Sequence, residues 1–171
     1  MKGLISYSSR TGNTKKLAET IYEHLSSVYD LDIKSVKETF DPKDYDFILH
    51  GIWVRMTGLD KDSKKFLSHL PKGMKVGIFG TSGGEHASAH SKRLDDALKH
   101  AENPFESLGT KLTYGKVDPS MISKIDGIIG NLLPKKMKSY IKEMSLHSRE
   151  ATEEERLEVA DYFKNQLQEK L

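Results

Sequence analysis

A short segment near the N-terminus combines residue types that bind phosphate without needing a cation. It places four hydroxyl side chains, an arginine and an amide around a glycine, in the run Ser8-Ser9-Arg10-Thr11-Gly12-Asn13-Thr14. A helical pattern follows directly, so the unpaired N–H groups of a helix N-terminus would face a bound anion. The glycine lets the backbone approach closely, and the hydroxyls add neutral donors. The segment therefore predicts a phosphate-binding loop; an ordinary helix cap rich in Ser and Thr is the alternative.

Missing motifs and the absence of cysteine limit the kinds of phosphate-containing ligand and of redox chemistry that the chain could use. The loop lacks the Gly-Lys-Ser/Thr ending of nucleoside-triphosphate loops and the G-x-G-x-x-G pattern of dinucleotide folds. The sequence contains no cysteine, which excludes disulfides, thiol chemistry and cysteine-ligated iron–sulfur clusters. Any electron transfer must therefore use an organic cofactor.

Other classes of function find little support in the sequence. The 27 basic and 25 acidic residues are interspersed and give a net charge of +2, too small to indicate nucleic-acid binding. No apolar run reaches the ~20 residues of a membrane span, so we expect a cytoplasmic protein. His86 and His90 have the spacing of a metal pair but lack a third nearby ligand, so we expect no metal site.

The order of apolar runs indicates an α/β protein. Short apolar runs alternate with longer segments of helical period, as in a parallel sheet covered by helices on both faces. The predicted strands are Lys2–Tyr7, Leu31–Val36, Asp46–Trp53, Met74–Gly80 and Lys111–Gly115. The second of these alternates in polarity, which suits an edge strand. Helices are predicted after Thr11, over 61–70, over 88–101 and after the capping-box pattern that starts at Thr152.

A long segment, Pro119–His147, separates the fifth strand from the last helix. Apolar residues recur at helical spacing as far as Leu133, and Pro134 interrupts the pattern. A second apolar stripe then consists of Met137, Tyr140, Ile141 and Met144. We therefore predict two additional helices within a single domain, 1–171. Simple packing on that domain is the first expectation, and docking of a partner or a second copy is the alternative.

The phosphate loop resembles that of the flavodoxin family, which has the form Ser-x-Thr-Gly-Asn-Thr and is matched residue for residue from Ser9 to Thr14. The resemblance covers most of the chain. It implies a flavodoxin-like, doubly wound, five-stranded parallel sheet of order 2-1-3-4-5, with the extra helices after the fifth strand. Such sheets bind ligands at the carboxyl ends of their strands. The resemblance also implies that the cofactor is FMN, its phosphate held by Ser9, Arg10, Thr11, Gly12, Asn13 and Thr14.

The same resemblance implies that two further loops hold the isoalloxazine ring. The first follows the third strand and contains Ile52, Trp53, Val54 and Arg55. The second follows the fourth strand and contains Thr81, Ser82, Gly83, Gly84 and His86. Trp53 is expected to stack on one face of the ring, with a core position as the alternative.

The second loop departs from the family pattern. Many flavodoxins have an aromatic residue, usually Tyr, followed by Pro, where this chain has Glu85-His86. We therefore expect the other face of the ring to be open, or to be covered by His86 or by the extra helices.

The function that the resemblance implies is that of a bacterial electron carrier working with a partner redox enzyme. A flavin-containing reductase is the expected partner; bilirubin reductase is one candidate, because small flavodoxin-like proteins accompany it in gut bacteria. An FMN-dependent NAD(P)H reductase of quinones or similar small molecules is the alternative, although no second dinucleotide motif is present. A flavodoxin-like binding module that has lost FMN is a further alternative, against which the intact phosphate loop argues.

The charge near the predicted loops differs from that of typical, acidic flavodoxins. The sequence pI is about 8.6, and Lys and Arg residues flank both the phosphate loop and the tryptophan loop. This pattern predicts a neutral or positive flavin edge, a less negative potential for full reduction, and an acidic partner surface.

Overall fold

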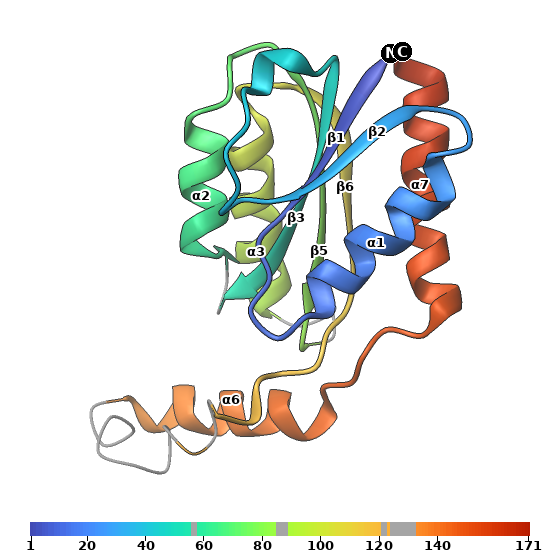
Figure 1. The fold of residues 1–171 in the computed structure, drawn as a ribbon. Helices are drawn as coiled ribbons and strands as arrows, with labels where there is room; N and C mark the ends of the chain where they lie inside the picture. The colour runs from blue at the N-terminus through green and yellow to red at the C-terminus, as the bar shows by residue number, and fades with distance from the viewer. Residues whose placement is uncertain (56–57, 85–88, 121–122, 124–132) are drawn as a thin grey trace.

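In the computed structural model the chain forms one twisted sheet between two layers of helices (Figure 1). The structure describes residues 1–55, 58–84, 89–120, 123 and 133–171. The strands are β1 (Lys2–Tyr7), β2 (Asp30–Ser35), β3 (Phe47–Arg55), β4 (Gly58–Leu59), β5 (Lys75–Ser82) and β6 (Glu106–Tyr114). Their order is β2-β1-β3-β5-β6, all parallel, and the short β4 pairs antiparallel with β3. Apart from this added β4, the predicted α/β fold and strand order are confirmed.

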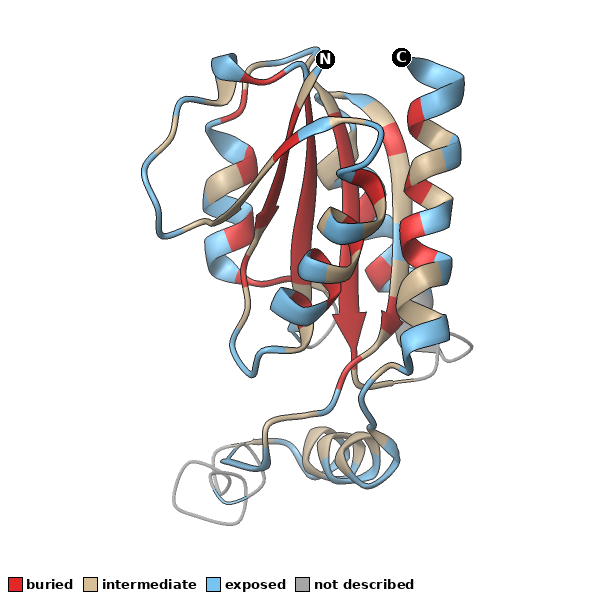
Figure 2. Ribbon diagram, turned by 45° about the vertical axis from the view of Figure 1, so that its right-hand side comes forward, coloured by how far each residue is buried: buried red, intermediate tan, exposed pale blue. Residues whose placement is uncertain are grey.

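Among the described residues, two helices cover each face of the sheet (Figures 1 and 2). One face carries α1 (Asn13–Leu25) and α7 (Glu153–Lys170), and the other carries α2 (Lys61–Ser68) and α3 (Ala89–Glu102). A short 3-10 helix, η1 (Pro42–Asp44), precedes β3. The predicted capping box begins α7, because the Thr152 hydroxyl accepts from the Glu155 N–H while the Glu155 carboxylate accepts from the Thr152 N–H.

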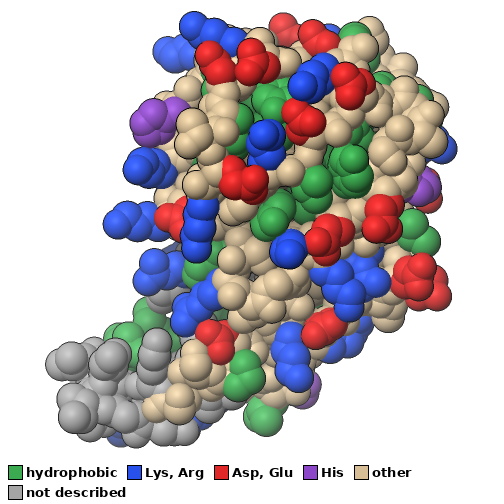
Figure 3. Space-filling view, viewed as in Figure 1, with side chains coloured by type: hydrophobic (Ala, Val, Ile, Leu, Met, Phe, Trp, Pro, Cys, Tyr) green, Lys and Arg blue, Asp and Glu red, His purple; other side chains and the backbone are tan. Residues whose placement is uncertain are grey.

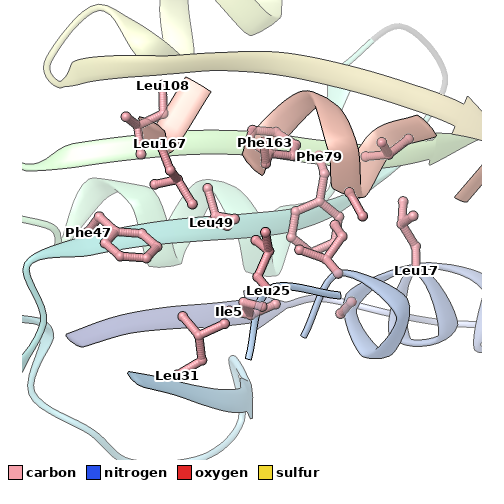
Figure 4. Packing of buried hydrophobic residues seen from close by; sticks show 14 residues of the cluster. Ile5, Leu17, Leu25, Leu31, Phe47, Leu49, Phe79, Leu108, Phe163 and Leu167 are labelled. Carbon is pink, nitrogen blue, oxygen red and sulfur yellow. The ribbon is translucent and has the colours of Figure 1, made fainter. Parts of the chain in front are cut away.

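The core consists of two apolar clusters, one on each face of the sheet. On the face of α1 and α7, Phe79 and Phe163 meet edge to face with ring centroids 6.3 Å apart (Figure 4). On the opposite face, Ile48, Ile52 and Ile78 pack under α2 and α3. Side chains that alternate along β3 and β5 thus enter both clusters, as the buried strands of a parallel sheet require.

A polar pair lies inside the second cluster. The Ser6 hydroxyl and Nδ1 of His50 are 2.8 Å apart, and both side chains are fully buried. The His50 ring lies 4.5 Å from the ring of Phe66, centroid to centroid. Among the described side chains, Nε2 of His50 is a buried nitrogen without a hydrogen-bond partner. Burial lowers the pKa of His50 to about 3, against a smaller opposing effect of Asp60, so the imidazole is neutral at physiological pH.

Three strands extend further than predicted. β3 continues to Arg55 because Val54 and Arg55 pair with β4, and β5 continues to Ser82 because it stays paired with β6. The residues expected in the tryptophan loop therefore belong to β3. β6 begins at Glu106, five residues before the predicted Lys111.

The additional helix α6 (Lys135–His147) lies beyond the carboxyl ends of the strands (Figure 1). It matches the second of the two predicted extra helices, and most of the first falls outside the described residues. Both chain ends lie at the opposite end of the sheet (Figures 1 and 2). There the Lys2 N–H donates to Asp46, and Lys75 Nζ donates to the carbonyl of Lys170.

Candidate functional site

The turn between β1 and α1 leaves open space at the start of the helix. Gly12 directly precedes α1 with φ 93° and ψ −17°, a left-handed conformation that favours glycine. A Cβ atom at Gly12 would meet nothing within 4 Å. Gly12 offers no side-chain cap, and α1, whose residues are all described, has no acidic residue in its first turn. The helix N-terminus is therefore accessible to an anion, as the sequence predicts.

Hydrogen bonds hold the polar side chains of this turn in place. The Asn13 amide donates to the Thr11 hydroxyl at 2.8 Å and to the Lys116 carbonyl at 3.1 Å. The second of these bonds joins the turn to the chain that follows β6. The Ser9 hydroxyl accepts from the Lys15 N–H within the first turn of α1, at 3.3 Å. The turn is thus ordered by its own side chains around the open space beside Gly12.

Arg10 links the turn to Trp53. Its guanidinium forms an ion pair with Asp118, at an N–O distance of 3.2 Å, and lies 5.9 Å from the centre of the Trp53 ring. Trp53 is half-buried near the end of β3 and is absent from both core clusters. The core position considered for the indole ring is therefore not observed, and the ring faces the site.

Asp60, which the sequence analysis did not single out, connects three elements beneath this turn. Its carboxylate accepts from the Ser8 hydroxyl at 2.8 Å and from the Trp53 N–H at 3.4 Å. It also caps α2 by accepting from the N–H and the hydroxyl of Ser63. The side chain is 1 % exposed. An Asp before a predicted helix is a cap signal, but the local sequence pattern does not show its bonds to Ser8, which follows β1, and to Trp53 of β3.

Thr14 and Thr81, two of the predicted site residues, meet below the turn. Their hydroxyl oxygens are 3.0 Å apart, and the Thr14 hydroxyl donates to the Ile52 carbonyl at 3.3 Å. Gly51 permits this approach, because a Cβ there would lie 3.0 Å from the Thr14 methyl group and overlap the Phe79 ring. These bonds lock α1 against β3 and β5.

A cavity of about 470 Å³ opens beside the turn, and it lies within the range typical of small-molecule sites. Eight of the predicted site residues line it, namely Arg10, Thr11, Asn13, Trp53, Val54, Arg55, Thr81 and Gly83. The predicted residues that do not line it are Ser9, Gly12, Thr14, Ile52, Ser82 and Gly84. Another predicted residue, His86, lies outside the described residues. The structure thus brings parts of all three predicted loops to one cavity.

The far wall of the cavity comes from α6 and from the chain after β6. The apolar side chains of this wall are Val117, Pro134, Met137, Tyr140, Ile141 and Met144. The four from α6 follow the spacing that predicted a helix after Pro134. Burial raises the pKa of the Tyr140 phenol, so the ring is partly withdrawn from water. From the sequence alone, the extra helices are only one of several possible covers of the ring, because helical spacing shows which side of a helix is apolar but not what that side faces.

Cationic side chains dominate the charge of the cavity lining. The basic lining residues are Arg10, Arg55, Arg93, Lys116 and Lys136. Among the described lining residues, Asp118 is the only carboxylate, and it is paired with Arg10. Elsewhere on the molecule, on the face seen in Figure 3, Lys and Arg are intermixed with Asp and Glu. The cavity is therefore more basic than this face.

Two further features are absent from the described part of the chain. Its residues contain no group of three or more His, Cys, Asp or Glu side chains placed to hold a metal ion. None of its helices combines the length and the apolar character needed to cross a membrane.

Comparison of the sequence with known proteins gives one consistent family. The family model described as "Flavodoxin domain" matches residues 4–163. A flavodoxin-like domain-containing protein named BilS, from Clostridioides difficile strain CD3, is 33% identical over 129 residues, covering 72% of each chain.

Comparison of the structure agrees. A flavodoxin of Streptococcus pneumonia TIGR4 superposes with a TM-score of 0.62 and 15% identity over 99% of both chains. A flavoprotein of Lactobacillus acidophilus NCFM, solved in complex with FMN, superposes with a TM-score of 0.53 and 22% identity, covering 72% of this chain and 97% of that one. These structures share the fold of the described β1-to-α7 layers. On the strength of the family match over nearly the whole sequence, the chain belongs to the flavodoxin family.

Proposed function

We propose that the chain binds FMN, with the phosphate at the start of α1 and the isoalloxazine ring in the cavity. The observation that carries this proposal is the open, left-handed turn at Gly12 directly beside an apolar cavity of about 470 Å³. The turn suits a phosphate, because it offers N–H groups and hydroxyls without a competing carboxylate in the first turn of α1. The cavity suits a planar aromatic ring, because its walls are mostly apolar.

The proposed contacts follow from the placement of the residues. The phosphate lies against the turn formed by Ser9, Arg10, Thr11, Gly12, Asn13 and Thr14. The ring lies between the end of β3 and the end of β5. The end of β3 contributes Ile52, Trp53, Val54 and Arg55, and β5 contributes Thr81 and Ser82, followed by Gly83 and Gly84. Trp53 stacks on one face of the ring. Ile52 and Ser82 are buried and contribute backbone rather than side-chain contacts.

We further propose that the protein is an electron carrier. Bound FMN supplies both one- and two-electron redox chemistry. The chain's own contribution is electrostatic: the five basic lining residues stabilise negative charge in the cavity, and they favour an acidic partner surface. The partner proposed is a flavin-containing reductase, and bilirubin reductase is the first candidate to test because of the sequence resemblance described above.

The absorbance spectrum of the purified protein tests FMN binding. We expect flavin bands, with about one FMN released per chain on denaturation, or stoichiometric uptake of added FMN by the apoprotein. A protein that is colourless and also fails to bind added FMN would contradict the proposal.

Stopped-flow reduction distinguishes a carrier from an NAD(P)H reductase. A carrier loaded with FMN is reduced slowly by NADH or NADPH alone and rapidly once a separate reductase is added. Rapid reduction by NADH or NADPH alone, followed by reoxidation with a quinone, would identify the chain as the reductase instead.

A further inference from the structure

The apolar side of α6 is only partly covered by the described residues. Every residue of α6 is described, and none is buried. The stripe formed by Met137, Tyr140, Ile141 and Met144 is only partly covered, in contrast with the fully buried stripe of α1. A helix of 13 residues has marginal stability on its own in water. Something must therefore cover this stripe if α6 is to hold its place.

The surface opposite the stripe is the proposed ring site. Tyr140, Ile141 and Met144 line the same cavity as Trp53. Contact between the two walls is close at the end of β5, because a Cβ at Gly83 would lie 3.5 Å from Cε of Met144. A Cβ at Gly84 would lie 3.7 Å from the same atom. The helix thus reaches the end of β5, which is proposed to flank the ring.

The chain after β6 anchors this arrangement at the C-terminal end of α6. The Ser148 hydroxyl accepts from the Val117 N–H at 3.1 Å, and Val117 packs against Gly83. Asn13 of the turn before α1 donates to the Lys116 carbonyl, in the same segment after β6. The walls of the cavity are therefore connected through residues 116–118.

We propose that α6 forms one face of the isoalloxazine site, with the Tyr140 ring and the Met144 thioether packed against the flavin on the side away from Trp53. This inference rests on the proposed binding of FMN. Both side chains suit a planar aromatic ligand, because aromatic rings and thioethers pack favourably on π-systems. Flavin binding in turn covers the apolar stripe that the described residues leave only partly covered. FMN and α6 therefore stabilise each other.

Titration of apoprotein variants with two flavins tests this role. FMN and riboflavin carry the same ring and differ in the phosphate, and flavin fluorescence reports binding of both. Tyr140→Ala and Met144→Ala are each expected to weaken binding by about fivefold to tenfold, a tenfold change corresponding to ~1.4 kcal/mol. The loss should be the same for both flavins, because α6 contacts the ring and not the phosphate.

Two control variants separate ring packing from general damage. Leu146→Ala removes a large apolar side chain from the same helix, but Leu146 is 83% exposed and does not line the cavity, so affinity should stay within about twofold of the wild type. Tyr140→Phe keeps the ring and should also bind as the wild type does. Weakened binding in Tyr140→Phe would assign the effect to the hydroxyl and overturn the packing role.

The outcomes separate this inference from the proposed function. If the wild type, Tyr140→Ala and Met144→Ala all bind FMN equally well, α6 does not touch the ring. The proposal that the chain binds FMN would then stand without a role for α6. A loss confined to FMN would place α6 at the phosphate and overturn the inference. A wild-type protein that binds neither flavin would remove both proposals together.

Discussion

Gly12 combines a backbone conformation that favours glycine with open space for the proposed phosphate. Its φ of 93° disfavours any side chain, and the space around its Cα is open on the side of the proposed phosphate. Gly73, which precedes β5, has a similar φ of 76° and similarly open surroundings. It lies just before β5, at the amino end of that strand, whereas Gly12 stands between the cavity-lining residues Thr11 and Asn13. The two glycines therefore form a matched pair in which only one is close to the proposed ligand.

We expect Gly12→Asp to weaken FMN binding by about a hundredfold or more, because a carboxylate would face the phosphate. Gly73→Asp should leave FMN affinity unchanged. Both substitutions should lower the free energy of unfolding by a similar amount, about 1 kcal/mol, since both place a side chain in the left-handed region. FMN titration and thermal unfolding of the two variants check this. Normal FMN affinity in Gly12→Asp would mean that the phosphate lies elsewhere.

His50 should make the stability of the protein depend on pH. Its pKa falls from an ordinary 6.5 to about 3 in the folded protein, because burial disfavours the charged imidazole. The unfolded chain takes up this proton below pH 6.5, while the folded protein does not. The corresponding stability is present above pH 6.5 and is lost as the pH falls, by about 2 kcal/mol between pH 7 and pH 5.

Urea unfolding of His50→Asn at a series of pH values measures this contribution. The asparagine amide can keep the bond to Ser6 but does not titrate, so the variant should lose about 2 kcal/mol less than the wild type between pH 7 and pH 5. His69→Asn, at an exposed histidine, serves as the control and should follow the wild type. Parallel pH profiles for the wild type and His50→Asn would show that His50 does not carry the effect.

Among the helices and strands, sequence patterns predicted the features that are determined by residues close together in the chain. The bounds of β1 and the cap of α7 follow from short runs, Lys2–Tyr7 and Thr152–Glu155, and both were predicted as observed. The turn around Gly12, where a phosphate is proposed to bind, also follows from a short run of residues. The start of β6 was missed because Gly109, at φ 89°, and a register shift between Val76 and Ile78 interrupt the strand pattern.

Other features of the site depend on long-range contacts that a sequence pattern does not contain. The continuation of β3 to Arg55 requires pairing with β4. The role of Asp60 requires Ser8, 52 residues away in the chain. The wall formed by α6 requires the chain after β6 to turn back across the strand ends. The sequence therefore predicted which loops come together at the strand ends and indicated the extra helices as one possible cover of the ring, while the position of α6 needed the structure.

For the whole molecule, the distribution of charge bears on the redox potential. The charges are nearly balanced overall, with 27 basic and 25 acidic residues, yet the described cavity lining has five basic residues and one paired carboxylate. If FMN occupies the proposed site, its reduction adds negative charge next to these cations. A basic lining therefore favours the reduced cofactor relative to an acidic one.

We expect Arg55→Gln and Lys136→Gln each to make the two-electron midpoint potential of bound FMN more negative, on the order of 20 mV at low ionic strength. Lys43→Gln, in η1 and outside the described cavity lining, should leave the potential unchanged. The differences should shrink as salt is added, because the lining is partly exposed to solvent. A spectroscopic redox titration measures all three. Equal potentials in the wild type and both lining variants would contradict an electrostatic role for the lining.

The position of the chain ends determines how the protein can be attached to a surface. Lys2 and Lys170 are held at the end of the sheet opposite α6, by bonds to Asp46 and to Lys75. A tether at either terminus would therefore orient the molecule with its cavity facing the solution. On an electrode, a layer of protein tethered in this way would expose the cavity to dissolved partners and hold it away from the electrode surface. Direct current should then be weak, and current should rise when a soluble mediator is supplied.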